Sequence, residues 1–261
     1  MRKINKKTVK MNILSIALLI FLLISTLSLS TFAMETESVV DDFGDTISLN
    51  KSPEKIISMS PNITELLYAI GLGEKVIAVS EECNYPEQML QAKENEEIES
   101  IGFTNEPNIE KIIEMEADLV IADNINPKEN VKRLKELGIN VLALSPKDFD
   151  SSFAAIEKIG KITANQDEAK KLIENMKNDI AKIEKLLNSQ NKRPSVFMEI
   201  WSEPIITAGG ETFMNEIITL AGGKNIGAEA GNGWPQYNLE KILTSDPEVY
   251  LISTHSTTGG G

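Results

Sequence analysis

Carboxylates are plentiful in this chain of 261 residues, but none forms an isolated pair that would suggest glycoside hydrolysis, and cysteine and histidine are scarce. It contains one cysteine, Cys83, and one histidine, His255. A single cysteine forms neither an intrachain disulfide nor a thiolate metal cluster, and a single histidine excludes multi-histidine metal sites and leaves little for a histidine-centred triad. The sequence also has no Gly-x-Ser-x-Gly elbow and no phosphate-binding loop. We therefore expect no catalytic or metal-binding residues and no enzymatic activity; Cys83 is either a reactive thiol or a buried residue without such a role.

Two glutamates, Glu110 and Glu240, stand at matched positions. The string Asn-Ile-Glu-Lys-Ile-Ile at 108–113 returns as Asn-Leu-Glu-Lys-Ile-Leu at 238–243, and an apolar strand pattern follows each. Either glutamate alone is explained by its place in the first turn of a helix, where the helix dipole stabilises a carboxylate. A matched pair also suits a partner with two-fold symmetry, because such a partner needs one anchor in each half of the chain.

Aromatic residues form only 5% of the chain, so those that fall on predicted loops are informative. Trp234 follows a Gly-Asn-Gly turn and Trp201 follows an apolar strand, both in the second half. Tyr85 and Phe103 lie on predicted loops of the first half. A large aromatic side chain on a loop, outside any helical or strand periodicity, has no obvious core to fill. For Trp234 the alternative is packing beneath its own loop.

The elements that position these residues alternate between strands and helices. In the first half, apolar strand patterns at 55–59, 76–79, 119–122 and 139–144 alternate with helical patterns at 61–70, 108–115 and 128–137. In the second half, strand patterns at 195–200, 205–208 and 249–253 accompany helical patterns at 213–220 and 238–244. This alternation predicts an α/β fold with a central parallel sheet in each of two lobes.

A long amphipathic helix is predicted between the two lobes. Residues 166–189 contain no glycine or proline and place their apolar residues on one stripe, and a shorter helix is predicted near 152–162. A helix of this length reaches ~36 Å, about the width of a small domain. We therefore expect an N-terminal lobe at 34–150, a connecting helical segment at 151–190 and a C-terminal lobe at 191–261. A cleft between two such lobes is the expected ligand site.

Residues 1–33 have the three-part layout of a secretory signal. Five basic residues precede an apolar stretch at 13–27, and Thr31-Phe32-Ala33 offers small residues for cleavage after Ala33. The alternative is an uncleaved membrane anchor, because residues 13–32 nearly reach the ~20 residues that span a bilayer. No cysteine follows the apolar stretch closely, so we expect an exported protein that is not a lipoprotein. The formal net charge of −13 argues against a nucleic-acid partner.

Several short strings, in their order and spacing, resemble one known family. In the first half they are Lys-Ile-Ile-Ser-Met-Ser-Pro-Asn-Ile-Thr-Glu at 55–65, Tyr-Pro at 85–86, Ile-Gly-Phe at 101–103 and Ala-Asp-Leu-Val-Ile-Ala at 117–122. In the second half they are Glu-Ile-Trp at 199–201, Thr-Ala-Gly at 207–209, Ala-Gly-Gly-Lys-Asn-Ile at 221–226 and Trp-Pro-Gln at 234–236. With these strings the chain resembles the helical-backbone periplasmic binding proteins, which deliver cobalamin, haem and ferric siderophores to ABC importers. The resemblance implies two α/β lobes, one connecting helix and modest closure on the ligand.

The same resemblance implies roles for individual residues. It implies that Glu110 and Glu240 meet arginines of the importer's permease. It also implies a ligand cleft, for which the candidate residues are Glu82, Tyr85, Phe103, Asp123, Trp201 and Trp234. Glu82 and Asp123 stand where family members carry aromatic residues, which makes this wall of the cleft more polar and leaves the identity of the ligand open.

The arginine content favours a corrinoid among the family's ligands. Beyond residue 33 the chain has two arginines, Arg133 and Arg193, and neither falls on a predicted cleft loop, whereas catecholate siderophores favour arginine forks. A haem would need a tyrosine or histidine axial ligand, for which Tyr85, Tyr237 and His255 are candidates. We expect a monomer without a cofactor that binds cobalamin or a related corrinoid and docks on an ABC permease dimer with its ATPase. The alternatives are a ferric siderophore or haem carrier and an extracellular sensor or scaffold domain.

The second half of the chain is shorter than the first. The strand predicted at 119–122 is followed by a helix and another strand, but the strand at 249–253 is followed only by a polar, glycine-rich stretch. The resemblance implies further helices and strands at this point. We therefore expect a truncated C-terminus that leaves the C-terminal lobe incomplete, with an uncovered strand edge.

Overall fold

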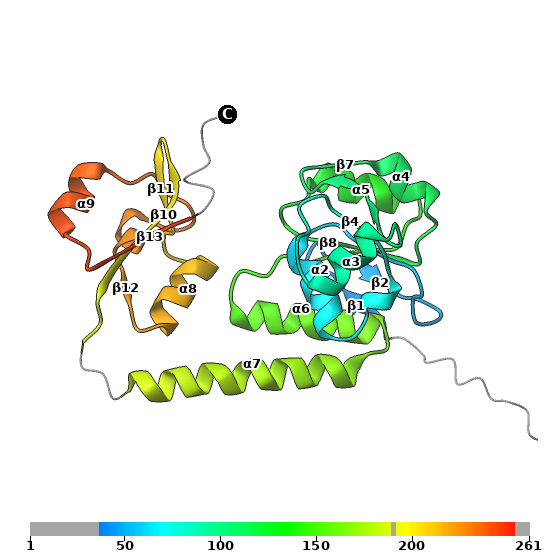
Figure 1. Ribbon diagram of the computed structural model, residues 1–261, viewed down its shortest axis with the longest axis horizontal. Helices are drawn as coiled ribbons and strands as arrows, with labels where there is room; N and C mark the ends of the chain where they lie inside the picture. Colours follow the sequence, from blue (N-terminus) through cyan, green and yellow to red (C-terminus); the bar gives the residue numbers. More distant parts are fainter. Residues whose placement is uncertain (1–36, 189–191, 254–261) are drawn as a thin grey trace, which may run out of the picture. The chain divides into compact units, whose positions relative to one another are not determined.

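The computed structural model describes residues 37–188 and 192–253, which form two α/β lobes and a long helix (Figure 1). The first lobe is built on five parallel strands, in the spatial order β5 (Glu99–Ser100), β4 (Val76–Val79), β3 (Ile56–Ser58), β8 (Leu119–Ala122) and β9 (Val141–Ala143). A short antiparallel hairpin of β1 (Val39–Val40) and β2 (Thr46–Ile47) precedes them. The parallel sheet predicted for this lobe is confirmed.

Helices cover both faces of this sheet. The helices α2 (Pro61–Ala69) and α6 (Phe149–Ile162) pack on one face, and α4 (Ile109–Glu114) and α5 (Lys128–Glu136) pack on the other. Successive residues of a strand point to opposite faces: Ile56 belongs to the first apolar cluster and Ile57 to the second, and both are fully buried. Burial on both faces explains why these strands read as continuous apolar runs in the sequence.

The sequence did not predict several elements of the first lobe. They include the edge strand β5, the helix α3 (Glu87–Glu94) and the two strands of a hairpin, β6 (Gly102–Phe103) and β7 (Glu106–Pro107). Helix α3 is mostly polar and buries only Met89, so it has no apolar periodicity. Strands of two residues are too short to show any alternation. Phe103, one of the predicted ligand residues, lies on this hairpin.

The long helix is α7 (Gln166–Leu187), which confirms the predicted connector and ends two residues earlier than expected. Its N-terminal half packs on the first lobe, where Ala169 and Ile173 are buried. Near its end, Leu187 contacts the second lobe: a Cβ built on Gly222 would lie only 2.7 Å from a δ carbon of Leu187. The connector therefore packs against elements of both lobes.

Strand β10 (Ser195–Ser202) is the centre of the second lobe. It pairs in parallel with β12 (Lys224–Asn225) and β13 (Val249–Ile252), and antiparallel with β11 (Ile205–Thr207). The expectation of a parallel sheet was wrong at β11. Only Glu203 and Pro204 separate β10 from β11, and so short a connection cannot cross over to a parallel strand.

The second lobe has a small core. Its helices are α8 (Phe213–Leu220) and α9 (Leu239–Ser245), and its central apolar cluster buries Phe197, Ile226 and Ile242. The four residues of β13 are between 37% and 56% exposed. The predicted lobe boundaries at 34, 151 and 191 and the predicted incompleteness of this lobe stay predictions.

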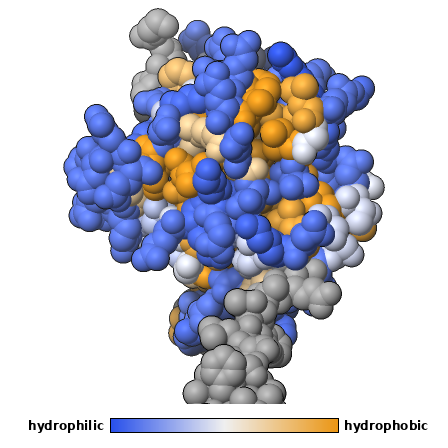
Figure 2. All heavy atoms as spheres, turned by 90° about the vertical axis from the view of Figure 1, so that its right-hand side faces the viewer, coloured by the Kyte–Doolittle hydropathy of each residue, from blue (hydrophilic) through white to orange (hydrophobic). Residues whose placement is uncertain are grey.

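One face of the described part is largely polar (Figure 2). Figure 2 shows one face on which hydrophilic residues predominate and apolar residues form separate patches between them. Among residues 37–188 and 192–253, no helix is long and apolar enough to cross a membrane. The predicted signal sequence and His255 lie outside the described residues.

Candidate functional site

The carboxyl ends of β3, β4 and β8 carry a cluster of buried polar side chains. In open α/β sheets, ligands bind outside this edge. The buried polar residues here are Ser58, Ser60, Thr64, Ser80, Thr104, Asp123 and Asn126. In the described part of the chain, no buried side-chain nitrogen or oxygen lacks a hydrogen-bond partner. The cluster is therefore a satisfied polar layer beneath the loops that carry the first-lobe candidates.

Asp123, a predicted ligand residue, belongs to this layer. Only 2% of its surface is exposed. One carboxylate oxygen accepts hydrogen bonds from the Asn62 amide and from the Ser60 hydroxyl, and the other accepts from the backbone N–H of Ile125. Asp123 thus fastens the β8–α5 loop to the start of α2, and a direct contact of its carboxylate with a ligand stays a prediction.

Asn126 lies three residues further and was not singled out from the sequence. Its side-chain amide donates to the carbonyl oxygens of Met59 and Thr104, both at 2.9 Å. Its side-chain oxygen accepts from the backbone N–H of Asp123 at 2.8 Å. These partners lie on three separate segments, so Asn126 joins the end of β3, the β6–β7 hairpin and the β8–α5 loop.

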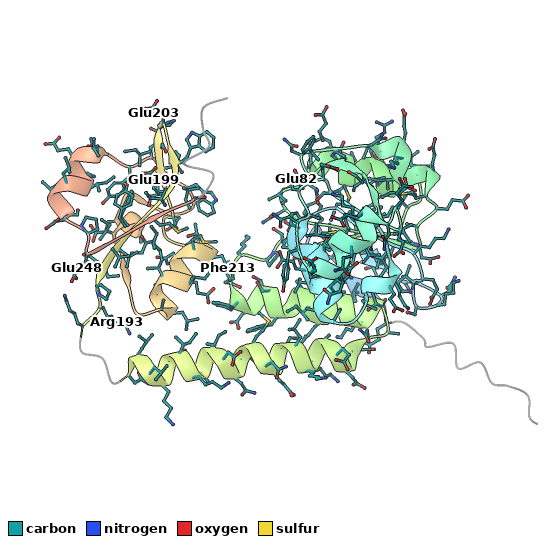
Figure 3. The ribbon with its side chains drawn as sticks, in the orientation of Figure 1. Glu82, Arg193, Glu199, Glu203, Phe213 and Glu248 are labelled. Atoms are coloured by element: carbon teal, nitrogen blue, oxygen red, sulfur yellow. The ribbon has the colours of Figure 1, made fainter. Side chains whose placement is uncertain are left out.

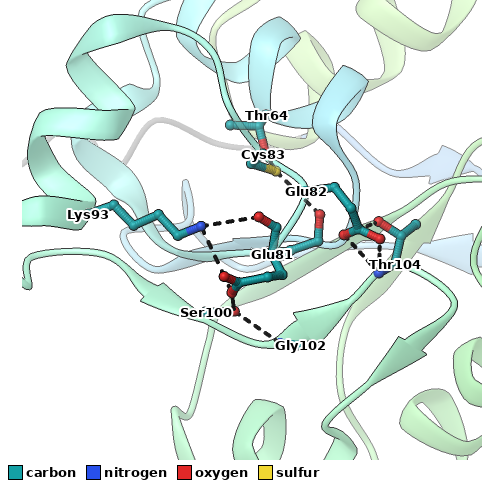
Figure 4. Close-up of polar contacts among 9 residues, drawn as sticks. Thr64, Glu81, Glu82, Cys83, Lys93, Ser100, Gly102 and Thr104 are labelled. Carbon is teal, nitrogen blue, oxygen red and sulfur yellow. Dashed lines mark hydrogen bonds and ion pairs between the residues drawn. The ribbon is translucent and has the colours of Figure 1, made fainter. Parts of the chain in front are cut away.

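Glu82 joins the β4–α3 loop to the same hairpin. Its carboxylate accepts hydrogen bonds from the backbone N–H of Thr104 and, at 2.9 Å, from the Thr104 hydroxyl (Figure 4). Burial raises the pKa of the Glu82 carboxyl, but hydrogen bonds from backbone N–H groups and from the hydroxyls of Thr104 and Ser80 outweigh it, and the pKa lies below its usual range. Glu82 therefore carries a negative charge at neutral pH.

Two aromatic candidates project from these connected loops. Tyr85 is 61% exposed and Phe103 is 53% exposed. Tyr85 also borders an apolar cavity of about 500 Å³ whose lining includes Leu66, Phe149 and Met176. The structure thus brings the four first-lobe candidates together through hydrogen-bonded loops and leaves the two aromatic side chains available at the surface.

Cys83 follows Glu82 directly but points into the protein. It is 3% exposed, and its thiol lies 3.2 Å from the Thr64 hydroxyl and 3.3 Å from that of Ser80 (Figure 4). A buried thiol between two hydroxyls has no access to a substrate. Of the two interpretations of Cys83, the structure favours the buried residue without a reactive role.

The second-lobe candidates, Trp201 and Trp234, lie on either side of β11. Trp201 pairs with Ile206 across the β10–β11 ladder, and Ile206 bridges Gln236 on its other side. Trp201 is 44% exposed, and its indole N–H donates to the carbonyl oxygen of Glu203 at the turn after β10. This hydrogen bond fixes the orientation of the ring.

The loop that carries Trp234 is held by backbone contacts with a glycine pair. Gly209 donates to the carbonyl of Gly233, and Gly210 exchanges hydrogen bonds with Gly231 and Gly233. A Cβ on Gly209 would lie 2.3 Å from the carbonyl oxygen of Gly231, so this approach requires glycine. Trp234 itself is 54% exposed, which disfavours the alternative that it packs beneath its own loop.

A polar cluster beside Trp201 was also missed by the sequence analysis. The Glu199 carboxylate on β10 accepts from the hydroxyls of Ser202, at 2.9 Å, and Tyr250, at 2.5 Å (Figure 3). Burial and the neighbouring Glu199 charge raise the pKa of Tyr250 to about 12. Tyr250 is therefore a neutral hydrogen-bond donor, and it links β13 to β10.

Glu110 and Glu240 occupy equivalent places on short helices of the two lobes. Each lies in the first turn, of α4 and α9 respectively, after an asparagine whose side-chain oxygen caps the helix. Both glutamates are exposed, and neither forms an ion pair within residues 37–188 and 192–253. Their carboxylates are thus free to meet positive charges of a partner.

Two comparisons of sequence identify relatives. The periplasmic binding protein family matches residues 56–260. A vitamin B12-binding protein of Yersinia pseudotuberculosis is 30% identical over 205 residues, which cover 78% of this chain and 70% of that protein. A substrate-binding lipoprotein of an ABC transporter from Bacillus subtilis is 34% identical over 223 residues, which cover 83% of this chain and 68% of the relative.

Solved structures show the same fold. The periplasmic vitamin B12 binding protein of Vibrio cholerae matches with a TM-score of 0.67 and 32% identity, over 80% of this chain and 79% of that one. A periplasmic haem-binding protein from Roseiflexus matches with a TM-score of 0.70, over 79% of this chain and 80% of that one. At 23% identity, this second likeness concerns the fold alone.

Proposed function

This chain belongs to the periplasmic binding protein family and is an extracytoplasmic substrate-binding protein of an ABC importer, and we propose that its ligand is cobalamin or a related corrinoid. As a binding protein it is not an enzyme. The observation that carries the proposal is a set of four exposed aromatic side chains, two on loops and two near the ends of strands, with no arginine among them. They are Tyr85, Phe103, Trp201 and Trp234. Flat rings of this size suit the faces and edges of a macrocycle.

The charges on these loops support a ligand that is not strongly anionic. Glu82 is ionised, as its lowered pKa indicates, and the two arginines of the described part lie on α5 and directly before β10. Catecholate siderophores and haem carboxylates would meet repulsion from Glu82 without a compensating guanidinium. The amide groups at the rim of a corrinoid are uncharged, and their N–H groups donate hydrogen bonds that a carboxylate accepts. The relatives named as vitamin B12-binding proteins agree with this choice.

A ferric siderophore or haem is the alternative ligand of the same fold. For haem, Tyr85 is the candidate axial ligand in the described part, because its side chain is 61% exposed, whereas Tyr237 is half-buried. From another class, an extracellular sensor or scaffold would keep the ligand site without needing the paired docking glutamates.

The partner that we propose is the permease dimer of the importer with its ATPase. Glu110 and Glu240 would each meet a positive residue of one permease subunit, with one contact per lobe. We further propose that residues 1–33 direct the export of the protein and that the exported protein is a monomer. The Bacillus subtilis relative is named a lipoprotein, so the comparisons do not support the expectation that this chain lacks a lipid anchor; that expectation stays a prediction.

Ligand titrations test the proposal. Cyanocobalamin, haemin, a ferric hydroxamate and a ferric catecholate are added separately to the purified chain, and the fluorescence of the two tryptophans is followed. We expect cyanocobalamin to bind tightest and to change the fluorescence, because both tryptophans belong to the proposed site. Tight binding of haemin or of a ferric siderophore, with no response to cyanocobalamin, would exclude the corrinoid and leave the family's other ligands.

A further inference from the structure

Every hydrogen bond of the Asn126 side chain joins it to a backbone group of the loops around it. Both donors of its side-chain nitrogen are used, on Met59 and Thr104, and its oxygen is used by Asp123. The residue is 2% exposed. No water or other solvent group is needed to satisfy it, so its contacts specify one relative placement of three segments.

Each of these three segments carries a candidate ligand residue or residues that hydrogen-bond to one. Thr104 follows Phe103 on the β6–β7 hairpin, and on its other side it binds the Glu82 carboxylate. Met59 precedes Ser60 and Asn62, whose side chains bind Asp123. One continuous set of hydrogen bonds therefore runs from Glu82 through Thr104 and Asn126 to Asp123.

The strands beneath these loops are anchored separately. Residues of β3 and β8 are fully buried in two apolar clusters, one on each face of the sheet. The loops beyond the strand ends have fewer apolar anchors: Cys83 and Ile101 are buried in the clusters, but Phe103 is 53% exposed and the Glu82 side chain lies at the surface. Loss of the Asn126 contacts should therefore loosen the loops more than it loosens the sheet.

We propose that Asn126 is the positioning residue of the ligand site, because its side-chain amide fixes the β6–β7 hairpin and the β8–α5 loop against the end of β3 and so holds Phe103 where it meets the ligand. The identity of the ligand rests on the proposed function, whereas the loop placement rests on the contacts above. Asn126 does not itself touch the ligand. It acts through Phe103.

A double-mutant cycle tests this coupling. Phe103→Ala alone, in the otherwise unmodified chain, should weaken cyanocobalamin binding about tenfold. Asn126→Ala alone should weaken it by a similar factor, and in that background Phe103→Ala should cost about twofold or less, because the ring is no longer held in place. Additive losses would overturn the proposal, since they would mean that Asn126 affects binding without Phe103.

Asn165→Ala is the matched control. The Asn165 side-chain amide also donates to a backbone carbonyl of the first lobe, that of Ile70, but at the opposite end of α2 from the candidate loops. This variant should lower the thermal midpoint, leave cyanocobalamin affinity within about twofold, and combine additively with Phe103→Ala. If Asn126→Ala does not fold, Asn126→Asp takes its place in the cycle, because it removes both N–H donations to Met59 and Thr104 at nearly equal volume.

Amide exchange separates this inference from the proposed function. If the unmodified chain binds no cyanocobalamin, the corrinoid proposal fails, and exchange in the unliganded protein decides the inference alone. The backbone N–H groups of Thr104 and Asp123 should exchange faster in Asn126→Ala than in Asn165→Ala, while those of β8 keep equal protection. Equal exchange at Thr104 and Asp123 in the two variants would overturn it.

Discussion

At the scale of single residues, Trp234 is the sharpest test of the ligand site. Its ring is 54% exposed on a loop that close glycine contacts hold in place. We expect Trp234→Ala to weaken cyanocobalamin binding by ~1–3 kcal/mol, the cost of losing one large aromatic contact. Trp234→Phe should retain most of the affinity. Titration of both variants, alongside thermal unfolding, checks the result; a destabilised protein whose folded fraction binds with unchanged affinity would mean that Trp234 serves packing instead.

The sequence predicts the exposed candidates of the site better than the buried ones. Tyr85, Phe103 and Trp234 were found because an aromatic side chain on a loop is a local feature, and all three are more than half exposed. Asn126 and Thr104 were missed because their importance depends on which loops meet in space. In the sequence, an asparagine before a proline is typical of a turn. Only the structure shows that its amide lies beside two carbonyl groups that are distant in the sequence.

At the scale of elements, Asp41 ties the β1–β2 hairpin to the first lobe. Its buried carboxylate accepts hydrogen bonds from the Lys135 ammonium on α5, at 2.5 Å, and from the backbone N–H groups of Phe43 and Asp45. Burial raises the pKa of this carboxyl, but Lys135 and the backbone donors outweigh it and hold the pKa below its usual range. The ionised form therefore stabilises the folded state.

We expect Asp41→Asn to lower the free energy of unfolding at pH 7 by about 1–3 kcal/mol, because donors that bind a carboxylate lose their charged partner. A depressed folded-state pKa adds stability above the unfolded pKa, and this stability is lost as the pH falls through the folded value. The difference between the parent and the variant should hence shrink below about pH 3.9.

Urea unfolding across this pH range measures the effect of Asp41. Asp45→Asn is the control, because Asp45 meets the same Lys135 but its side chain is 60% exposed, so its loss should cost less than about 1 kcal/mol. Equal effects of the two variants, or a difference independent of pH, would contradict the account of Asp41.

The elements that the sequence placed correctly are those with buried periodic faces. The strands β4 and β8 have the predicted bounds, because their apolar residues enter a core directly. The antiparallel strand β11 was placed in a parallel sheet because its apolar residues carry no information on direction. Only the length of the turn before β11 indicates that this strand is antiparallel to β10.

At the scale of the whole molecule, the two lobes are more alike at the N-termini of α4 and α9 than in their hydrophobic cores. The asparagine cap and the following glutamate recur on α4 and α9, although α9 leaves Leu239 and Leu243 58% and 72% exposed. Two core clusters enclose the first sheet, whereas the central cluster of the second lobe buries three residues. A feature kept in both lobes despite such different packing points to an interaction that needs both.

Charge reversal at both glutamates tests that interaction. Glu110→Lys and Glu240→Lys together should abolish stimulation of the importer's ATPase and uptake in reconstituted vesicles, because two positive charges would then face the positive residues expected on the permease. Ligand affinity should stay within about threefold of the parent, because both residues lie on helices outside the candidate loops. Glu114→Lys is the control for one of the two reversals: it makes the same charge change as Glu110→Lys alone, at the exposed C-terminal end of α4, and should leave stimulation nearly intact. Loss of ligand binding with undiminished ATPase stimulation would exclude the docking role and return both glutamates to the stabilisation of their helix N-termini.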